Sequence, residues 1–184
     1  MAWLGRVLKN RRAGQSKLAW NAPNLAGPDT LKLTSPDFEF ECTIPMICIS
    51  HRVGGEDVSP ELNWPTAPEG TAQLLLVVED PDAPMSAPNV HALALLDPSV
   101  LRLPQGALDA SNPGEGVRVL RSSVGRGYYG PAPVKGHGPH RYVFQLFALG
   151  TPVSVADSAR PREVIAAAGG VLARGRLDGM YERI

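Results

Sequence analysis

Long apolar runs and an excess of charge are both missing from this sequence of 184 residues. No stretch approaches the ~20 apolar residues of a membrane-spanning helix. Residues 1–12 carry basic side chains without the continuous apolar segment of a secretory signal. We therefore expect a cytoplasmic protein with no membrane span, while peripheral membrane contact stays open. The 18 basic and 18 acidic side chains balance, which argues against a nucleic-acid partner, because such binding needs a surplus of Lys and Arg.

Cysteine is also scarce, since Cys42 and Cys48 are the only two. On one unbroken strand they would share a face about 20 Å apart at ~3.3 Å per residue, too far for a disulfide. Pro45 lies between them and could bend the chain, so a disulfide stays open. We favour buried free thiols in a reducing compartment.

Glycine and proline are abundant, with 19 and 18 residues spread along the chain. This distribution predicts many turns and short strands rather than long helices. Three apolar runs are typical of buried strands, at residues 74–78, 90–96 and 141–149. Residues 117–119 predict a shorter one.

Two further patterns predict elements around these strands. Alternating side chains at 38–42 predict a half-buried strand that continues as an extended apolar piece over 44–49. Apolar residues recur at helical spacing from Pro161 to Leu172, although Gly169 and Gly170 weaken that helix. Strands followed by one helix indicate a mainly β fold, an antiparallel β sandwich with a C-terminal helix and few short helices.

Residues 1–28 differ from the rest and are predicted to form an N-terminal arm on a single domain of residues 29–184. Trp3, Leu4, Val7 and Leu8 fall at helical spacing, with Arg6 between them. This short amphipathic helix could anchor the protein to a membrane surface or a partner. We favour the alternative that the arm packs its Trp and Leu side chains onto its own domain or onto a second copy, so a homodimer stays open.

The most chemically informative stretch is the Asp-Pro-Asp-Ala-Pro corner at residues 80–84, which ends the buried run. Burying two carboxylates is costly unless they find partners. We expect those partners from His91 and from the Gly-His-Gly-Pro-His-Arg-Tyr segment at 136–142. The candidates near strand ends and loops are Asp80, Asp82, His91, Tyr128, Tyr129, His137, His140 and Tyr142.

Residues of these types can form four kinds of site. The histidine spacing does not match a compact metal motif, so we expect no metal. Ser122 and Ser123 do not sit in a nucleophile-elbow sequence, and Gly125-Arg126-Gly127 is a fragment of a nucleotide-binding glycine loop without a helix after it. A small anion pocket fits best.

In such a pocket the imidazoles of His91 and His140 would donate hydrogen bonds to a phosphate or carboxylate. Asp80 or Asp82 behind them would fix their tautomers and raise their pKa. Backbone N–H groups near Gly130 and Gly136 could approach the anion closely. We expect one aspartate to orient a histidine and the other to tie down the corner.

At this level of detail the sequence resembles the phosphatidylethanolamine-binding protein family in its bacterial and archaeal branch. The resemblance covers residues 31–184. It rests on Ser-Pro-Glu-Leu-Asn-Trp at 59–64, Asp-Pro-Asp-Ala-Pro at 80–84 followed by His91, Tyr-Gly-Pro at 129–131, Gly-Pro-His-Arg-Tyr-Val-Phe at 138–144 and Leu-Asp-Gly-Met-Tyr at 177–181.

The resemblance implies a Greek-key-like β sandwich with a shallow pocket for phosphorylated head groups and small anions such as phosphate or acetate. No cofactor or turnover is general to the family, and some members inhibit kinases or serine proteases. The implied ligand-binding residues are Asp80, Asp82, His91, Gly130, Pro133, His140 and Tyr142.

Departures from the family pattern fall on the pocket wall. Ala92 follows His91 where that branch usually has Trp, and Ala132-Pro133-Val134 stands where a second consecutive proline is common. We expect a binding or regulatory module without turnover. The alternatives are a protease or kinase inhibitor that uses the pocket rim, and a phosphoester-type enzyme with His91 and His140 as acid and base.

Overall fold

Seven strands form two antiparallel sheets in the computed structural model, which describes residues 2–184 except the side chains of Ala2, Leu4 and Arg6. The larger sheet has the order β5–β3–β2–β6–β7, and β1 pairs with β4 in the smaller one. The strands are β1 (Leu62–Asn63), β2 (Gln73–Asp80), β3 (Asn89–Leu96), β4 (Arg102–Leu103), β5 (Val117–Val119), β6 (His140–Leu149) and β7 (Val171–Tyr181).

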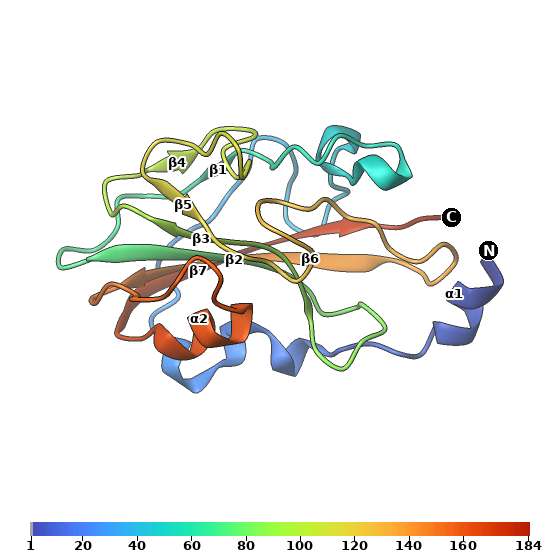
Figure 1. Ribbon diagram of the computed structural model, residues 1–184, viewed down its shortest axis with the longest axis horizontal. Helices are drawn as coiled ribbons and strands as arrows, with labels where there is room; N and C mark the ends of the chain where they lie inside the picture. Colours follow the sequence, from blue (N-terminus) through green and yellow to red (C-terminus); the bar gives the residue numbers. More distant parts are fainter. Residues whose placement is uncertain (1) are drawn as a thin grey trace.

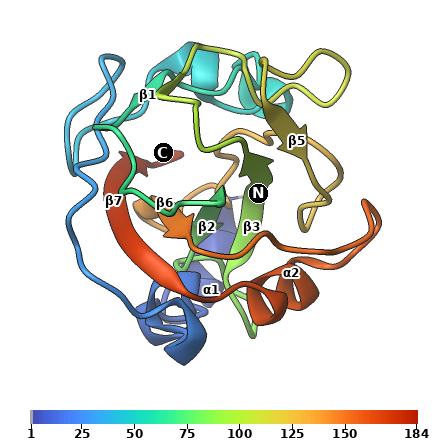
Figure 2. The same ribbon diagram turned by 90° about the vertical axis from the view of Figure 1, so that its left-hand side faces the viewer.

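The central strands β2, β3 and β6 are apolar on both sides because both faces of the large sheet are covered. One core lies between this sheet and the layer that contains β1, β4 and residues 38–53, and it includes Phe38, Ile44 and Phe144. The second core, with Leu25 and Phe147, lies on the opposite face. Helix α2 and the N-terminal segment lie on that second face (Figures 1 and 2).

The helices are short. They are α1 (Ala2–Leu8), α2 (Pro161–Ala167) and five single-turn 3-10 helices, η1 (Gln15–Lys17), η2 (Ala19–Asn21), η3 (Pro23–Leu25), η4 (Met46–Cys48) and η5 (His51–Val53). The mainly β class, the pair of antiparallel sheets and the helix near the C-terminus confirm the predicted fold. Among the described residues no helix is both long and apolar enough to cross a membrane.

The strand predicted at 38–42 and the extended piece at 44–49 are wrong. Phe38 is buried but Phe40 is largely exposed, and Glu41 has a positive φ of 59° that interrupts extended geometry. Residues 46–48 form a 3-10 turn after Pro45. Residues 38–49 therefore form an irregular segment, in which only some of the apolar side chains, such as Phe38 and Ile44, are buried.

The predicted helix also extends too far. Helix α2 ends at Ala167, and Val171 begins the eleven-residue strand β7. Ala168 is already extended, with φ −78° and ψ 154°, so the helical path ends there. Gly170, with a left-handed φ of 64°, then lies directly before β7. Val171 and Leu172 match a helical period by spacing, but both lie in β7, where Val171 pairs with Leu149 of β6.

The N-terminal arm packs on its own domain, one of the two placements that we favoured for it. Leu18 and Leu25 are buried. The ring of Trp20 lies 6.0 Å from the Phe147 ring, and the Arg174 guanidinium lies 4.0 Å from the Trp20 centroid. Trp3 and Val7 remain exposed, whereas the Leu4 and Arg6 side chains of the predicted amphipathic helix lie outside the described part.

Both cysteines are free thiols, as favoured, but their environments differ. Cys42 is exposed, so the expectation that both are buried is wrong for this residue. Cys48 is buried, and burial raises the pKa of its thiol to about 12.

Candidate functional site

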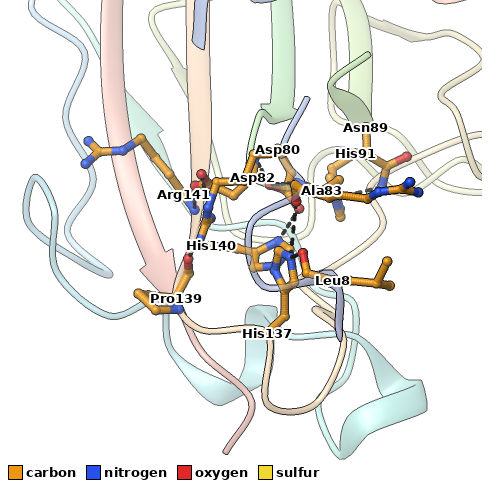
Figure 3. Close-up of polar contacts among 12 residues, drawn as sticks. Leu8, Asp80, Asp82, Ala83, Asn89, His91, His137, Pro139, His140 and Arg141 are labelled. Atoms are coloured by element: carbon orange, nitrogen blue, oxygen red, sulfur yellow. Dashed lines mark hydrogen bonds and ion pairs between the residues drawn. The ribbon is translucent and has the colours of Figure 1, made fainter. Parts of the chain in front are cut away.

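A β-bulge at the ends of β2 and β3 positions the first site residue. Val78 pairs with Ala92 and Glu79 pairs with Val90, which leaves His91 as the extra residue on β3. A bulge redirects the side chain of its extra residue. The His91 ring therefore faces Tyr142, at 5.0 Å between ring centroids with an edge-on geometry, on the face that also holds Asp80 and His140 (Figure 3).

The Asp-Pro-Asp-Ala-Pro corner is held by its own carboxylates. Asp80 Oδ1 accepts hydrogen bonds from the backbone N–H groups of Asp82 and Ala83, at 2.7 and 3.0 Å. Asp80 Oδ2 lies 2.7 Å from His140 Nδ1. Asp82 accepts the backbone N–H of Arg141 at 2.8 Å and pairs with Arg12 at 2.7 Å. We expected one aspartate to orient a histidine and the other to tie down the corner. Asp80 does both, while Asp82 holds Arg141 and Arg12.

A chain of hydrogen bonds continues from Asp80 into the N-terminal arm (Figure 3). His140 Nε2 lies 2.7 Å from His137 Nδ1. His137 Nε2 then reaches two carbonyl oxygens of the arm, at 2.8 Å from Leu8 and 3.2 Å from Arg11. Asp80, His140 and His137 are all buried. The chain therefore connects the site directly to the arm.

The partners in this chain determine how many protons it holds. A carbonyl oxygen accepts but never donates, so His137 Nε2 carries a proton. The links from Asp80 to His140 and from His140 to His137 each need one proton as well. Three protons on one carboxyl and two imidazoles give zero net charge, which suits a cluster removed from water. With two protons, two nitrogen lone pairs would face each other at 2.7 Å.

His91 has a different environment. Its Nδ1 donates to the carbonyl oxygen of Tyr129 at 2.6 Å, so Nε2 accepts from the Asn89 amide at 3.0 Å. Burial lowers the pKa of His91, and this effect outweighs the nearby Asp80 carboxylate, which raises it. The expectation that the aspartates would raise the pKa of this histidine is therefore wrong.

The Tyr142 hydroxyl is the unsatisfied group of the site. It is buried and has no hydrogen-bond partner in the part of the chain that the structure describes. Its ring lies near both histidines, with its centroid 6.5 Å from that of the His140 ring and 5.0 Å from that of the His91 ring. A buried hydroxyl without a partner costs about 1–3 kcal/mol. Burial raises the pKa of Tyr142 well above its usual value, so the group stays a neutral donor.

In the loop at 128–137, the backbone N–H groups of Gly130 and Gly136 are not free to bind a ligand. The Gly130 N–H donates to Asp57 at 2.7 Å, and a side chain at Gly130 would meet the backbone of Ile49 at 2.5 Å. The Gly136 N–H donates to the carbonyl of Arg183 at 2.9 Å. Both backbone groups that we expected to face an anion are thus engaged within the protein. Pro133 is buried in the same loop.

Asp57 anchors this loop from the other side. Burial raises its pKa, but backbone N–H groups of His51 and Gly130 and the His51 ring outweigh burial, so the pKa is lowered. Asp57 is therefore an ionised acceptor that holds residues 51 and 130 together. Gly130 directly follows Tyr129, whose carbonyl oxygen contacts His91.

The N-terminal arm closes the site. A Cβ atom at Gly5 would lie 2.2 Å from the Lys135 carbonyl oxygen, so α1 contacts the 135–137 backbone directly. Further along the arm, Ala13 N–H donates to the Ala83 carbonyl and Gly14 N–H to the Pro81 carbonyl, both at 2.9 Å. The residues of the site are between 0% and 3% exposed: Asp80, His91, His137, His140 and Tyr142.

His137 and the arm are what sequence reasoning missed. His137 belonged to the predicted cluster but was not assigned a binding role, and Arg12 was not assigned one at all. No local pattern connects residues 5–14 to residues 135–140, because the contact spans more than 120 positions of the chain. Within the described residues no group of three His, Cys, Asp or Glu side chains is arranged to hold a metal ion.

This geometry can be compared with known proteins. The family model described as Phosphatidylethanolamine-binding protein matches residues 34–182. The chain belongs to this family. The phosphatidylethanolamine-binding protein match begins after the arm, so residues 1–33 lie outside it.

Related sequences and structures agree with the assignment. A protein of a fungal species described as Phomoidride biosynthesis cluster protein B is 35% identical over 158 residues, which cover 79% of this chain and 74% of that protein. A UPF0098 protein of Pyrococcus horikoshii is 35% identical over 133 residues, which cover 70% of this chain and 67% of that protein.

Among solved structures, Escherichia coli YbcL, described as a member of the mammalian PEBP family, superposes with a TM-score of 0.75 at 28% identity. The match covers 83% of this chain and 98% of YbcL. Archaeal and bacterial relatives thus support the branch of the phosphatidylethanolamine-binding protein family that the sequence resembles.

Proposed function

We propose that this protein binds a small anion or phosphorylated head group at the site formed by Asp80, His91, His140 and Tyr142. The observation that carries the proposal is the buried Tyr142 hydroxyl, which has no partner among the described residues, on a ring that lies near the rings of two histidines. A ligand oxygen would satisfy it. Family membership supports the same site, because the family resemblance implies an anion pocket with these residues.

In this proposal the His137 imidazole occupies the position of the ligand. His137 Nδ1 lies 2.7 Å from His140 Nε2, where an anion oxygen would accept the same proton. Asp80 holds the other face of His140, so His140 Nε2 points toward the vacated space. A charge-assisted hydrogen bond from protonated His140 to an anion is stronger than one to a neutral imidazole.

Binding then requires the arm and the 134–139 loop to move. The site groups are between 0% and 3% exposed while Leu8 and Arg11 contact His137. A protein that must open before binding shows an apparent Kd raised by the reciprocal of the open fraction. The protein is thus a binding module whose affinity depends on the position of its own N-terminal arm.

The test is a titration of inorganic phosphate into the full chain, followed by NMR of the histidine side chains and by calorimetry. We expect the His91 and His140 signals to shift. Tyr142→Phe, which removes one donor to a charged ligand, should raise the Kd by about tenfold or more, since such a bond is worth about 1.5–3 kcal/mol.

The matched control is Tyr181→Phe, because the Tyr181 hydroxyl contacts the Met46 sulfur at 4.0 Å. Its Kd should stay within about twofold of the wild type, well below the change of a lost hydrogen bond. Saturation that leaves both histidines unmoved while other residues shift would place the anion elsewhere and refute the proposal.

A further inference from the structure

A second concave region lies on the opposite face of the large sheet. It is a cavity of about 930 Å³ between residues 17–24, the 85–88 loop and α2. Figures 1 and 2 show α2 beside the N-terminal 3-10 helices on this face. Glu79 and Val90 lie at its inner wall, and their chain neighbours Asp80 and His91 belong to the anion site. The sheet therefore separates the two regions.

The cavity combines an apolar interior with a basic rim. Leu18, Ala19, Val90 and Ile165 are among its apolar lining residues. Sites for small molecules typically have volumes of about 300–1,000 Å³ and are lined mostly by apolar side chains with a few charged groups. The volume and lining both fit a ligand with an extended aliphatic part.

Three arginines stand at this rim, Arg121, Arg160 and Arg162, and all are exposed. In the part of the chain that the structure describes, none of their guanidinium groups has a carboxylate partner. By contrast, the nearby Arg118 and Arg126 both pair with Asp157. A guanidinium matches the planar, two-oxygen face of a carboxylate or phosphate. The unpaired arginines thus give the rim a charge that an anion would complement.

The two carboxylates that line the cavity, Glu79 and Glu163, are outnumbered by its four cationic side chains, so the lining keeps a net positive charge. Glu79 accepts hydrogen bonds from the Ala19 N–H and the Gln145 amide, at 2.7 and 2.8 Å, and lies at the buried end. Glu163 accepts the backbone N–H of Arg160 at 2.7 Å. The remaining cation, Lys17, donates to the carbonyl of Ser86 at 2.8 Å.

We propose that this cavity binds a single-chain lipid anion, with the aliphatic chain against the apolar interior and the head group at Arg121, Arg160 and Arg162. The head group is a carboxylate or a phosphate monoester, which share two or more acceptor oxygens and a negative charge. This site is independent of the anion site that the family resemblance implies.

The experiment is calorimetry on the full chain with two probes below their micelle concentrations, dodecyl phosphate and dodecanoate. We expect at least one of them to bind, and the tighter one identifies the head group. Reversing two rim charges with Arg160→Glu and Arg162→Glu should raise the Kd by about tenfold or more, since a charge juxtaposed with a like charge costs more than 1.4 kcal/mol. Arg102→Glu, an exposed arginine on β4, is the control and should leave the Kd unchanged.

A second pair of variants tests the cavity itself. Ala166 lines the cavity from α2, while Ala167 is the next residue and is exposed outside it. Ala166→Trp should abolish binding by filling the space, and Ala167→Trp should not. Tyr142→Phe, which alters the anion site on the other face, should leave binding of the probe unchanged. A weaker Kd for the probe in Tyr142→Phe, equal effects of the paired variants, or no binding of either probe would overturn the proposal.

Discussion

Asp80 uses each carboxylate oxygen for a different purpose, and this makes it hard to replace. Oδ1 caps the turn at Asp82 and Ala83, while Oδ2 holds His140. An asparagine can present one carbonyl oxygen, so either the turn or the histidine loses its acceptor. Asp80→Asn should therefore lower the free energy of unfolding by roughly 2–4 kcal/mol, because it breaks a buried, hydrogen-bonded pair.

The comparison variant is Asp82→Asn, measured in the same urea unfolding experiment. Asp82 is partly exposed and pairs with Arg12 near solvent, so its loss should cost about 1 kcal/mol or less. Equal losses for the two variants would contradict the assignment of distinct roles to Asp80 and Asp82.

Glu79 should make the free energy of unfolding depend on pH, and the direction of its pKa shift gives the sign of that dependence. Burial raises its pKa above the ordinary 4.5, and hydrogen bonds from Gln145 and Ala19 offset part of that effect. The native state therefore binds the proton more readily than the unfolded state. The stability that the protonated form contributes is fully present below pH 4.5 and is lost as the pH rises through the raised pKa of the native state.

Glu79→Gln should remove this dependence. Both hydrogen bonds to Glu79 end on the same oxygen, Oε2, so the carbonyl of a glutamine can accept them both. The variant should be more stable than the wild type at pH 7, and the difference should shrink as the pH approaches 4.5. Denaturant unfolding at a series of pH values measures this, with the exposed Glu56→Gln as control. A variant less stable at pH 7 would contradict the account.

At the residue scale, the sequence predicted which side chains meet better than it predicted how deeply they are buried. The meeting of Asp80 with His140 and the separate role of Asp82 follow from two carboxylates at the end of a buried strand, which must find partners. The lowered pKa of His91 could not be predicted, because it depends on how completely the fold buries this ring. The sequence shows which charged residues could lie near His91, but it does not show how far the fold excludes solvent from that ring.

At the scale of elements, strands with apolar residues on both faces were predicted correctly, as β2, β3 and β6 show. Strand β7 was missed because its apolar residues are interrupted by Arg174, Arg176 and Asp178, which form ion pairs on the sheet. Paired charges can occupy a strand that hydrophobic periodicity alone does not detect.

Gly175 on β7 tests the contact between this strand and the segment before β1. Leu31 N–H donates to the Arg174 carbonyl, and a Cβ atom at Gly175 would lie 1.8 Å from the Leu31 carbonyl oxygen. Since that neighbour is backbone, Gly175→Ala must separate the two segments and should cost about 2–4 kcal/mol of the free energy of unfolding, in the range of severe core substitutions.

Gly169→Ala is the matched control in the same unfolding measurement. Its nearest neighbour would be the Asn24 carbonyl oxygen at 3.8 Å, an ordinary contact distance. It should change stability by about 0.5 kcal/mol or less. A mild effect at Gly175 comparable to that at Gly169 would mean that β7 and residues 29–33 are not held in this contact.

At the scale of the whole molecule, the N-terminal arm connects the two faces of the sheet. Residues 15–25 cover one face with Leu18 and Leu25, and residues 5–14 continue to the anion site at the end of the strands. Figure 1 shows α1 at the end of the molecule where β6 begins. Inhibition of a protease or kinase and phosphoester turnover stay predictions that enzyme assays would test.

The central claim is that the arm controls access to an anion site, and Gly5→Ala tests it most directly. The added methyl group would lie 2.2 Å from the Lys135 carbonyl oxygen and so should displace α1 without removing any side chain of the site. Inorganic phosphate should then bind about tenfold more tightly, if the closed state is favoured by about 1.4 kcal/mol.

Val7→Ala on the exposed side of the same helix is the control and should bind phosphate as the wild type does. The measurement is the phosphate Kd of the three proteins by calorimetry, with the His140 imidazole signals followed by NMR. The account predicts tighter binding for Gly5→Ala alone, with His140 shifted by phosphate. Identical affinities in all three proteins, or weaker binding by Gly5→Ala, would contradict it.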